Sequence, residues 1–433
     1  MTVVFERPYE FVPPFRGTLW PWLIQRLRLY DRYLKRKEGV VDYELRGTEH
    51  LKQSLDAEHG VLLAPNHCRY ADPLVMGWPA RQLGIHVHAM ASWHLFNEGR
   101  FDRFALRRMG AFSIFREGND RQSLETAIDI LVEGRRPLII FPEGTTNRTN
   151  DQLKPLLDGV AFIARTAAKR RAKRHADPAH AAASGSGQVV VHPVAIKYLC
   201  LEKIDRWATQ QLDLFEQRLG WKLMPRRSIR ERTVQLAEAL LALKEVQYFG
   251  HCNGGDLSTR RDRLIEHVLS STEAQMKLDQ PSTETRERVR LIRSTASSRY
   301  FDNGADPSTA TELKRCVLAA DFAQDLSSYP DSYLMPDQVT DTRIVETIQR
   351  MQETVNGNAD HTIPLKAVIE FAPAIEVDTR RAPKGQRDPL MQSLEDELTT
   401  RLAKLATEAR KLSSAHVGVQ ASAQFSQVKR RTF

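Results

Sequence analysis

A histidine and an aspartate stand close together in NHCRYAD, residues 66–72, directly after the apolar run 61–65. We interpret the run as a strand and the following stretch as the turn that leaves it. In such a turn the two side chains can meet, and the Asp72 carboxylate would accept the Nδ1 proton of His67 and leave Nε2 free to remove a proton. The pattern places no protein nucleophile beside this pair, which suggests that the substrate supplies the hydroxyl group.

Two other interpretations of this stretch stay open. A histidine and an aspartate at this spacing also arise by chance, with His67 simply hydrogen-bonded in a loop. Cys68 is a competing nucleophile, but adjacent side chains on an extended segment point apart. A buried and unreactive cysteine is therefore the expected role of Cys68.

A second polar stretch, FPEGTTNR at residues 141–148, ends another apolar run. Pro142 and Gly144 predict a tight turn that presents backbone N–H groups and the Glu143 carboxylate to a polyol. Ligands of open α/β sheets bind at this edge of the sheet. Further donors are Thr145, Thr146 and Arg148. Pro-Glu-Gly is also ordinary turn chemistry, so a purely structural role remains an alternative.

The third stretch, GAFSIFR at residues 110–116, is a glycine, a short apolar run and an arginine. The planar guanidinium of Arg116 is suited to bidentate capture of a phosphate. A single arginine after a strand is also commonly no more than surface charge.

The elements that must position these stretches alternate along the chain. Runs typical of strands cover 61–65, 85–91, 111–115, 137–142 and 189–196. Apolar residues at helical spacing predict helices over 121–134 and 151–168. This alternation predicts an α/β fold in which helices cover the faces of a sheet.

The pattern changes after about residue 203. Long helical patterns dominate residues 204–360, for example at 230–245, 257–276, 283–293 and 340–354. A strand pattern returns in KAVIEFAPAIEV at 366–377, and 389–412 again has helical spacing. The tail 413–433 is polar and is expected to fray.

Residues 19–37, LWPWLIQRLRLYDRYLKRK, predict one amphipathic helix with tryptophan and leucine on one face and arginine and lysine on the other. This composition is typical of a helix that lies in a membrane interface. An ordinary helix docked on the domain core fits the same spacing. Basic residues outnumber acidic ones up to residue 37, which favours membrane contact.

The composition excludes several classes of protein. Of 433 residues, 41% are hydrophobic and 27% charged, so the chain is neither wholly disordered nor fibrous. The formal net charge of +9 suits anionic partners such as phospholipid headgroups, phosphorylated substrates or nucleic acid. No apolar run approaches the ~18–20 residues that span a bilayer, and the N-terminus does not have the pattern of a secretory signal. Four scattered cysteines predict neither a zinc site nor a disulfide framework.

Together, NHxxxxD at 66–72, GxFxIFR at 110–116 and FPEGT at 141–145 resemble the glycerolipid acyltransferase family, which includes glycerol-3-phosphate and 1-acylglycerol-3-phosphate acyltransferases. The strand VVVHPVA at 189–195 is similar to the family's fourth block. Lys154 and Gly159 are similar to a lysine and a glycine that family members carry after the FPEG turn. The resemblance is strongest over residues 59–200, and KAVIEFAPAIEV resembles the last strand of the family domain.

The resemblance implies a mixed sheet flanked by helices and an O-acyl transfer without a covalent acyl-enzyme. His67, oriented by Asp72, would deprotonate a hydroxyl of a glycerol phosphate or lysophospholipid, and this hydroxyl would attack the thioester of acyl-CoA or acyl-carrier protein. The reaction would serve phospholipid biosynthesis and would need no metal or redox cofactor. The implied substrate-binding residues are Arg116, Glu143 and Gly144 at the glycerol phosphate, Gly110 before Arg116, Thr145 and Arg148 in the same set, and Pro193 near the acyl or thioester pocket.

The sequence departs from the family pattern in two places. FPEGT is commonly followed by arginine and serine, whereas Thr146 and Asn147 follow here and the nearest arginine is Arg148; whether the acceptor is phosphorylated is therefore open. The long helical region is not a general family feature, and a lid, a membrane contact, a carrier-protein docking site or packing would each explain it. The expected organisation is an N-terminal membrane-interface region 1–58, an acyltransferase core 59–203, a helical insertion 204–360, a return to the core 361–412 and a polar tail 413–433.

The expected partners are the cytoplasmic face of a membrane, bound peripherally, the acceptor lipid and, as one of the two donors, acyl-carrier protein. A lipid-binding or membrane-tethering protein on the same scaffold is the alternative, but a binder would not need the His67–Asp72 pair. The basic run 286–293 carries interleaved glutamate and indicates a solvated helix face. Nucleic acid is therefore not an expected partner.

Overall fold

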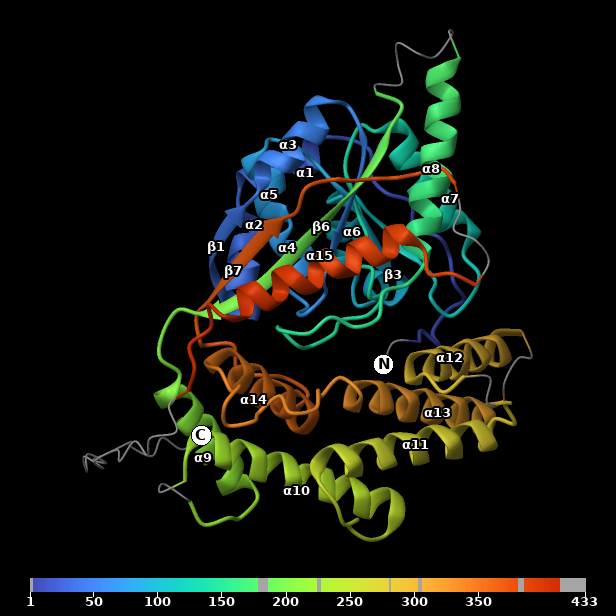
Figure 1. Ribbon diagram of the computed structural model, residues 1–433. Coiled ribbons are helices and arrows are strands. Elements are labelled where there is room, and N and C mark those ends of the chain that lie inside the picture. The colour runs from blue at the N-terminus through green and yellow to red at the C-terminus, as the bar shows by residue number, and fades with distance from the viewer. Residues whose placement is uncertain are drawn as a thin grey trace, which may run out of the picture.

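An eight-stranded sheet forms the centre of the computed structural model, which describes residues 3–177, 186–223, 227–279, 282–302, 306–380 and 385–412 (Figure 1). The strand order is β1-β7-β6-β2-β5-β3-β4, with β8 paired to β6. The strands are β1 (Val40–Arg46), β2 (Gly60–Pro65), β3 (His88–Ser92), β4 (Ala111–Ile114), β5 (Leu138–Ile139), β6 (Val189–Cys200), β7 (Leu365–Phe371) and β8 (Ile375–Glu376). Only β6 with β7 and β6 with β8 pair antiparallel. The prediction of a mixed α/β sheet flanked by helices is confirmed.

Strands β2 and β6 lie at the middle of the sheet, and every residue of both is buried. Because strand side chains alternate between faces, Val61 and Leu63 pack on one core cluster and Leu62 and Ala64 on another. Helices that cover the first face are α2 (Leu29–Tyr33), α3 (Thr48–Asp56), α4 (Asp72–Val75) and α5 (Gly77–Gln82); those on the second are α7 (Arg121–Glu133), α8 (Gly159–Ala176) and α15 (Pro389–Ala406).

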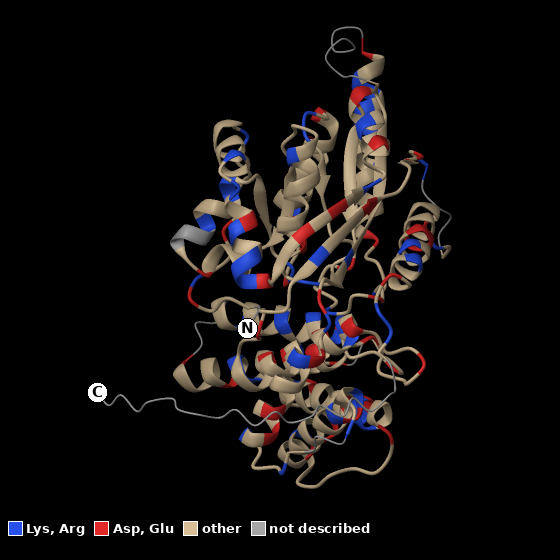
Figure 2. Ribbon diagram, turned by 90° about the vertical axis from the view of Figure 1, so that its left-hand side faces the viewer, with Lys and Arg blue, Asp and Glu red and all other residues tan. Residues whose placement is uncertain are grey.

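A body of helices lies below the sheet in Figure 1, at the end of the strands where β6 leads into α9. It consists of α9 (Asp205–Arg218), α10 (Ile229–Phe249), α11 (Leu257–Gln275), α12 (Thr285–Asp302), α13 (Pro307–Leu326) and α14 (Asp341–Asn356). Helices α10 to α13 share an apolar core with Val3 and Phe5, whereas Ile344 and Ile348 of α14 belong to the sheet's core. Figure 2 shows Lys and Arg interspersed with Asp and Glu over this body, the pattern of solvated helix surfaces.

The structure differs from the sequence predictions in several elements, among them the strand expected over 366–377, which is divided into β7 and β8. The helix expected over 19–37 is divided into α1 (Leu19–Arg26), α2 and a π-turn, η1 (Leu34–Glu38), because Arg28 takes a left-handed conformation with φ of 51°. The helix expected from residue 151 begins only at Gly159, after an irregular loop. Strand β1 was not predicted, and it places part of the range 1–58 in the central sheet. The tail 413–433 lies outside the described residues.

The remaining short helices are η2 (Trp93–Asn97) and α6 (Arg100–Arg108). Among the described residues, no helix is both long and apolar enough to cross a membrane.

We predict that α15, which follows the helical body in the sequence, stabilises the sheet by packing on its second face. Leu398 is fully buried against the second face, so Leu398→Ala should lower the free energy of unfolding by about 2–5 kcal/mol through lost burial and a cavity. The exposed neighbour Thr399 provides the control, because Thr399→Ala should change it by less than about 0.5 kcal/mol. Urea denaturation measures both, and equal values for the two variants would contradict this role of α15.

Candidate active site

His67 and Asp72 meet where the chain leaves β2 and enters α4. The His67 Nδ1 atom lies 2.9 Å from Oδ2 of Asp72, and the backbone N–H of Arg69 donates to the same oxygen at 2.9 Å. The Asp72 side chain is fully buried and that of His67 is 15% exposed. Because a carboxylate only accepts hydrogen bonds, the proton of the neutral imidazole is on Nδ1 and its lone pair is on Nε2. The predicted base and its orienting carboxylate are thus brought together.

The second oxygen of Asp72 accepts the hydroxyl proton of Tyr198, a residue of β6, at 2.6 Å. Burial, and then the charge of Asp72, raise the pKa of Tyr198 far above its ordinary value, so the phenol remains a donor. Both carboxylate oxygens are therefore satisfied, which fixes the orientation of Asp72. Tyr198 was not predicted; the signal was a tyrosine in the wholly buried run after Pro193, where its hydroxyl needs a partner.

Two buried asparagine side chains bond to the backbone of β6 in the way that a neighbouring strand would. Asn66 accepts from the N–H of Ile196 at 2.6 Å and donates to its carbonyl at 3.0 Å. Asn150 makes the same pair of bonds with the backbone of Tyr198, at 2.8 and 2.6 Å. The side-chain amides thus continue the pairing of β6 beyond the end of β2, and they hold the loops that carry His67 and residues 147–158. Neither role was predicted.

Glu143 is fully buried and does not face a ligand, contrary to the prediction. One carboxylate oxygen accepts the backbone N–H of His67 at 2.7 Å, and the other accepts that of Lys154 at 2.9 Å. Burial raises the pKa of Glu143 to about 8, while these two N–H groups act in the opposite direction. Gly144 has a φ of 70°, which confirms the tight turn. Glu143 therefore joins three segments of the site instead of presenting itself to a polyol.

The loop after β5 contacts His67 through three further residues. The N–H of Asn147 donates to the carbonyl of His67 at 2.5 Å, and the Phe141 ring lies 4.2 Å from the imidazole at an interplanar angle of 29°. The Thr146 hydroxyl lies 3.2 Å from Nε2. The imidazole is thus fixed in position, with its basic nitrogen turned toward the FPEGTTN turn.

Arg116 lies at this turn, as predicted, but part of its guanidinium is already engaged. Nη1 donates to the carbonyl of Gly144 at 2.6 Å and Nε to the Ser92 hydroxyl at 3.0 Å. Its Nη2 donates to no group in the described part of the chain. Gly110 is not brought to the site: it precedes β4 at the opposite end of the strand, where its φ of 97° and the nearby Val87 carbonyl favour glycine.

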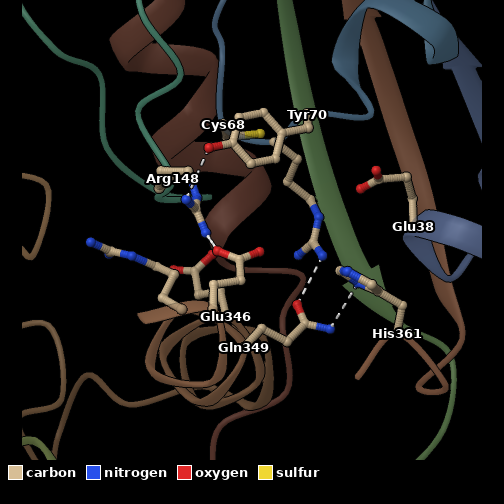
Figure 3. A pocket seen from close by; sticks show the side chains of 10 residues that line it. Glu38, Cys68, Tyr70, Arg148, Glu346, Gln349 and His361 are labelled. Carbon is tan, nitrogen blue, oxygen red and sulfur yellow. Dashed lines mark hydrogen bonds and ion pairs between the residues drawn. The ribbon is translucent and has the colours of Figure 1, made fainter. Parts of the chain in front are cut away.

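Arg148 lies on a different side of the loop from Arg116. Its guanidinium forms an ion pair with Glu353 of α14 and donates to the Tyr70 hydroxyl at 3.1 Å (Figure 3). Arg148 and Arg116 therefore do not form one basic cluster. Thr145, in the same turn as Arg148, has a buried hydroxyl with no hydrogen-bond partner among the described groups.

Helix α14 of the helical body is bonded directly to the loops of the site. Glu346 accepts the N–H of Asn150 at 3.1 Å, and Gln349 accepts from Arg69 at 2.8 Å. A cavity of about 30 Å³ remains between α14 and residues 68–70 (Figure 3). His67 is not among the residues that line this cavity.

Pro193 and Cys68 are both buried in the core. Pro193 pairs with Ala64 of β2 and lies between the stretches of β6 that pair with β7 and with β8, where its missing N–H costs little. Burial raises the pKa of the Cys68 thiol far above its ordinary value. Cys68 is therefore no nucleophile at neutral pH.

A protein-family model described as Acyltransferase matches residues 42–197. The matched range begins in β1, contains the His67–Asp72 pair and the turn 141–148, and ends within β6. No curated protein matches the chain. The family match supports acyltransferase activity in general and specifies neither donor nor acceptor.

We predict that Glu143 stabilises the fold through its two backbone bonds. Above a pH of about 8, where Glu143 is ionised, Glu143→Gln replaces one oxygen by an NH₂ donor that opposes a backbone N–H, so the free energy of unfolding measured there should fall by about 1–3 kcal/mol. Urea unfolding of the variant beside Glu49→Gln, at a side chain that is 68% exposed, checks this expectation. Unchanged stability of Glu143→Gln would show that the two bonds contribute nothing.

Proposed function

We propose that the protein transfers a fatty acyl group from acyl-CoA or acyl-carrier protein to a hydroxyl of a glycerol phosphate or lysophospholipid, as a step of phospholipid biosynthesis. The observation that carries this proposal is the buried Asp72 carboxylate 2.9 Å from Nδ1 of His67. In the neutral imidazole this contact places the proton on Nδ1 and the lone pair on Nε2, and it orients the ring, as a general base requires.

In the proposed reaction, Nε2 of His67 removes the proton of a hydroxyl as its oxygen attacks the thioester carbonyl, and the sulfur leaves as a thiol. General-base catalysis accounts for about 10²–10⁴-fold of the rate. Positioning by the rigid loops and hydrogen bonds to the developing oxyanion must supply the rest. Of the two arginines, we assign Arg116 to an acceptor phosphate, because Nη2 of Arg116 has no described partner whereas Arg148 is paired with Glu353.

We propose that residues 19–33 contact the membrane at its cytoplasmic face. Leu19 and Trp22 are 66% and 53% exposed, which is unusual for such large apolar side chains. Further exposed residues of this N-terminal surface are Leu27, Leu29 and Tyr33, with Arg26, Arg28 and Arg32 among them. Apolar side chains interleaved with arginine fit the boundary between acyl chains and anionic headgroups.

We predict that His67→Ala lowers the rate of acyl transfer by about 10²–10⁴-fold, because the base is lost. The test incubates purified protein with radiolabelled acyl-CoA or acyl-carrier protein and a panel of lysolipids and glycerol 3-phosphate. His251→Ala is the matched control, because His251 is exposed on the helical body.

Equal transfer by wild type and His67→Ala would contradict the proposed function. Liposome binding by the wild type without turnover on any acceptor would favour the alternative of a lipid-binding or tethering protein.

We predict that the double variant Trp22→Ser/Leu27→Ser weakens binding to vesicles of anionic phospholipid at least about tenfold, because less apolar area enters the interface. Vesicle sedimentation measures the binding, with neutral phosphatidylcholine vesicles as comparison. The control is Leu243→Ser, at a position on α10 that is 58% exposed. An equal loss in the control, or no loss in the double variant, would place the membrane contact elsewhere.

A further inference from the structure

Helix α12 of the helical body turns one face toward the loops of the candidate active site. Nη1 of Arg286 donates to the carbonyl of Pro155, in the loop that follows β5, at 2.7 Å. Arg293 is about two helical turns further along α12, and Tyr300 is about two turns beyond Arg293. These three residues therefore lie on the same face of α12, with Arg293 in the middle.

The far end of this face is attached to the sheet by the N-terminal segment of the chain. The Tyr300 ring lies 4.8 Å from the ring of Phe5. Further along the same segment, the ring of Tyr9 is stacked on that of Phe115, with 4.8 Å between their centroids and 12° between their planes. Phe115 directly precedes Arg116. The face of α12 is thus held at one end to the loop after β5 and at the other to the segment beside Arg116.

The Arg293 side chain leaves part of its guanidinium available to a ligand. Nε and Nη2 both bond to one carboxylate oxygen of Asp321 on α13, at 2.8 and 2.5 Å. Nη1 donates to no group in the described part of the chain. Only 11% of this side chain is exposed. A small anion such as a phosphate can reach a recessed guanidinium of this kind, whereas the surface of a folded protein cannot.

Arg116 and Arg293 lie close enough for their charges to interact. Burial lowers the pKa of Arg116; Glu117 and Asp321 counteract this shift, and the Arg293 charge adds to it. Burial also raises the pKa of Glu117, which favours its uncharged form. Two guanidinium groups that share a half-buried space repel each other, and an anion between them would remove that repulsion.

A neutral histidine lies in the same space. Burial lowers the pKa of His94 to about 3, and the charges of Arg116 and Arg293 add to this shift. The Ser92 hydroxyl accepts from Nε of Arg116 at 3.0 Å and lies 2.9 Å from Nδ1 of His94. When Ser92 donates to Nδ1, the neutral ring keeps its proton on Nε2. His94 then has an N–H group that can donate to an anion beside the two arginines.

We propose that Arg293, a residue of the helical body outside the family match, binds the phosphate of the acceptor together with Arg116. This inference rests on the proposed acyl transfer and names a second phosphate-binding residue for it. The phosphate accepts from Nη2 of Arg116 and Nη1 of Arg293, the guanidinium nitrogens that have no described partner. The helical body thereby favours a phosphorylated acceptor, which the packing of its helices alone would not do.

The test measures steady-state acylation of glycerol 3-phosphate and of 1-oleoylglycerol 3-phosphate by the full-length protein, with palmitoyl-CoA as donor. Arg293→Gln should raise the KM for the acceptor that the wild type uses at least about tenfold, because a charge-assisted hydrogen bond is lost. The kcat should change less than about threefold, and the KM for palmitoyl-CoA should stay the same. Arg293→Lys keeps the charge without the planar fork and should have an intermediate acceptor KM.

Two further variants separate phosphate binding from a structural role of Arg293. Asp321→Asn breaks the same ion pair but keeps the guanidinium, so the acceptor KM should rise less than about threefold. Arg290→Gln is the matched control on α12, because the Arg290 side chain is 64% exposed and pairs with Glu287 of its own helix. Its KM values should equal those of the wild type. Circular dichroism establishes that each variant is folded.

An unchanged acceptor KM in Arg293→Gln, an equal rise in Asp321→Asn, or a rise for palmitoyl-CoA alone would overturn this inference and leave the proposed function intact. Isothermal titration calorimetry with glycerol 3-phosphate, in the absence of donor, measures binding independently of transfer. Binding that Arg293→Gln weakens at least about tenfold, in a protein that acylates no acceptor, would support the phosphate site and overturn the proposed function.

Discussion

The backbone N–H and the backbone carbonyl of His67 are both hydrogen-bonded to the loop that follows β5, and the geometry of the whole site depends on these two bonds. Its N–H donates to the buried Glu143 carboxylate, and its carbonyl accepts the N–H of Asn147. Burial disfavours the charged form of Glu143, and a backbone N–H donates to each of its two oxygens. The NHxxxxD loop and the FPEGTTN turn therefore behave as one unit.

Segments far apart in the sequence complete this unit. Strand β6 supplies Tyr198 to Asp72 and offers its backbone to the side chains of Asn66 and Asn150. Helix α14, from the helical body, binds the same loops through Glu346 and Gln349. Because α14 also packs in the core of the sheet, the helical body is physically connected to the loops that orient the base.

The sequence predicted the elements that have a regular apolar pattern. Strands near 61–65, 111–115 and 189–196 and the helix that ends before Gly134 are present, and so is the contact between His67 and Asp72. The missed features are long-range bonds between side chains and backbone, as at Asn150 and Glu143, since no local pattern shows which distant N–H a polar side chain will meet. Strand β1 was missed because its half-exposed residues follow the segment interpreted as an amphipathic helix.

The central claim is that Asp72 holds the Nδ1 proton of His67 and leaves Nε2 as the base. Nitrogen-15 NMR of protein labelled in histidine tests it most directly, with the His67 signals assigned by their loss in His67→Gln. We predict that the neutral imidazole carries its proton on Nδ1, as a hydrogen-bonded and slowly exchanging proton, with Nε2 unprotonated, and that this proton signal is lost in Asp72→Asn. A proton on Nε2 instead, or shifts averaged between the two tautomers, would contradict it.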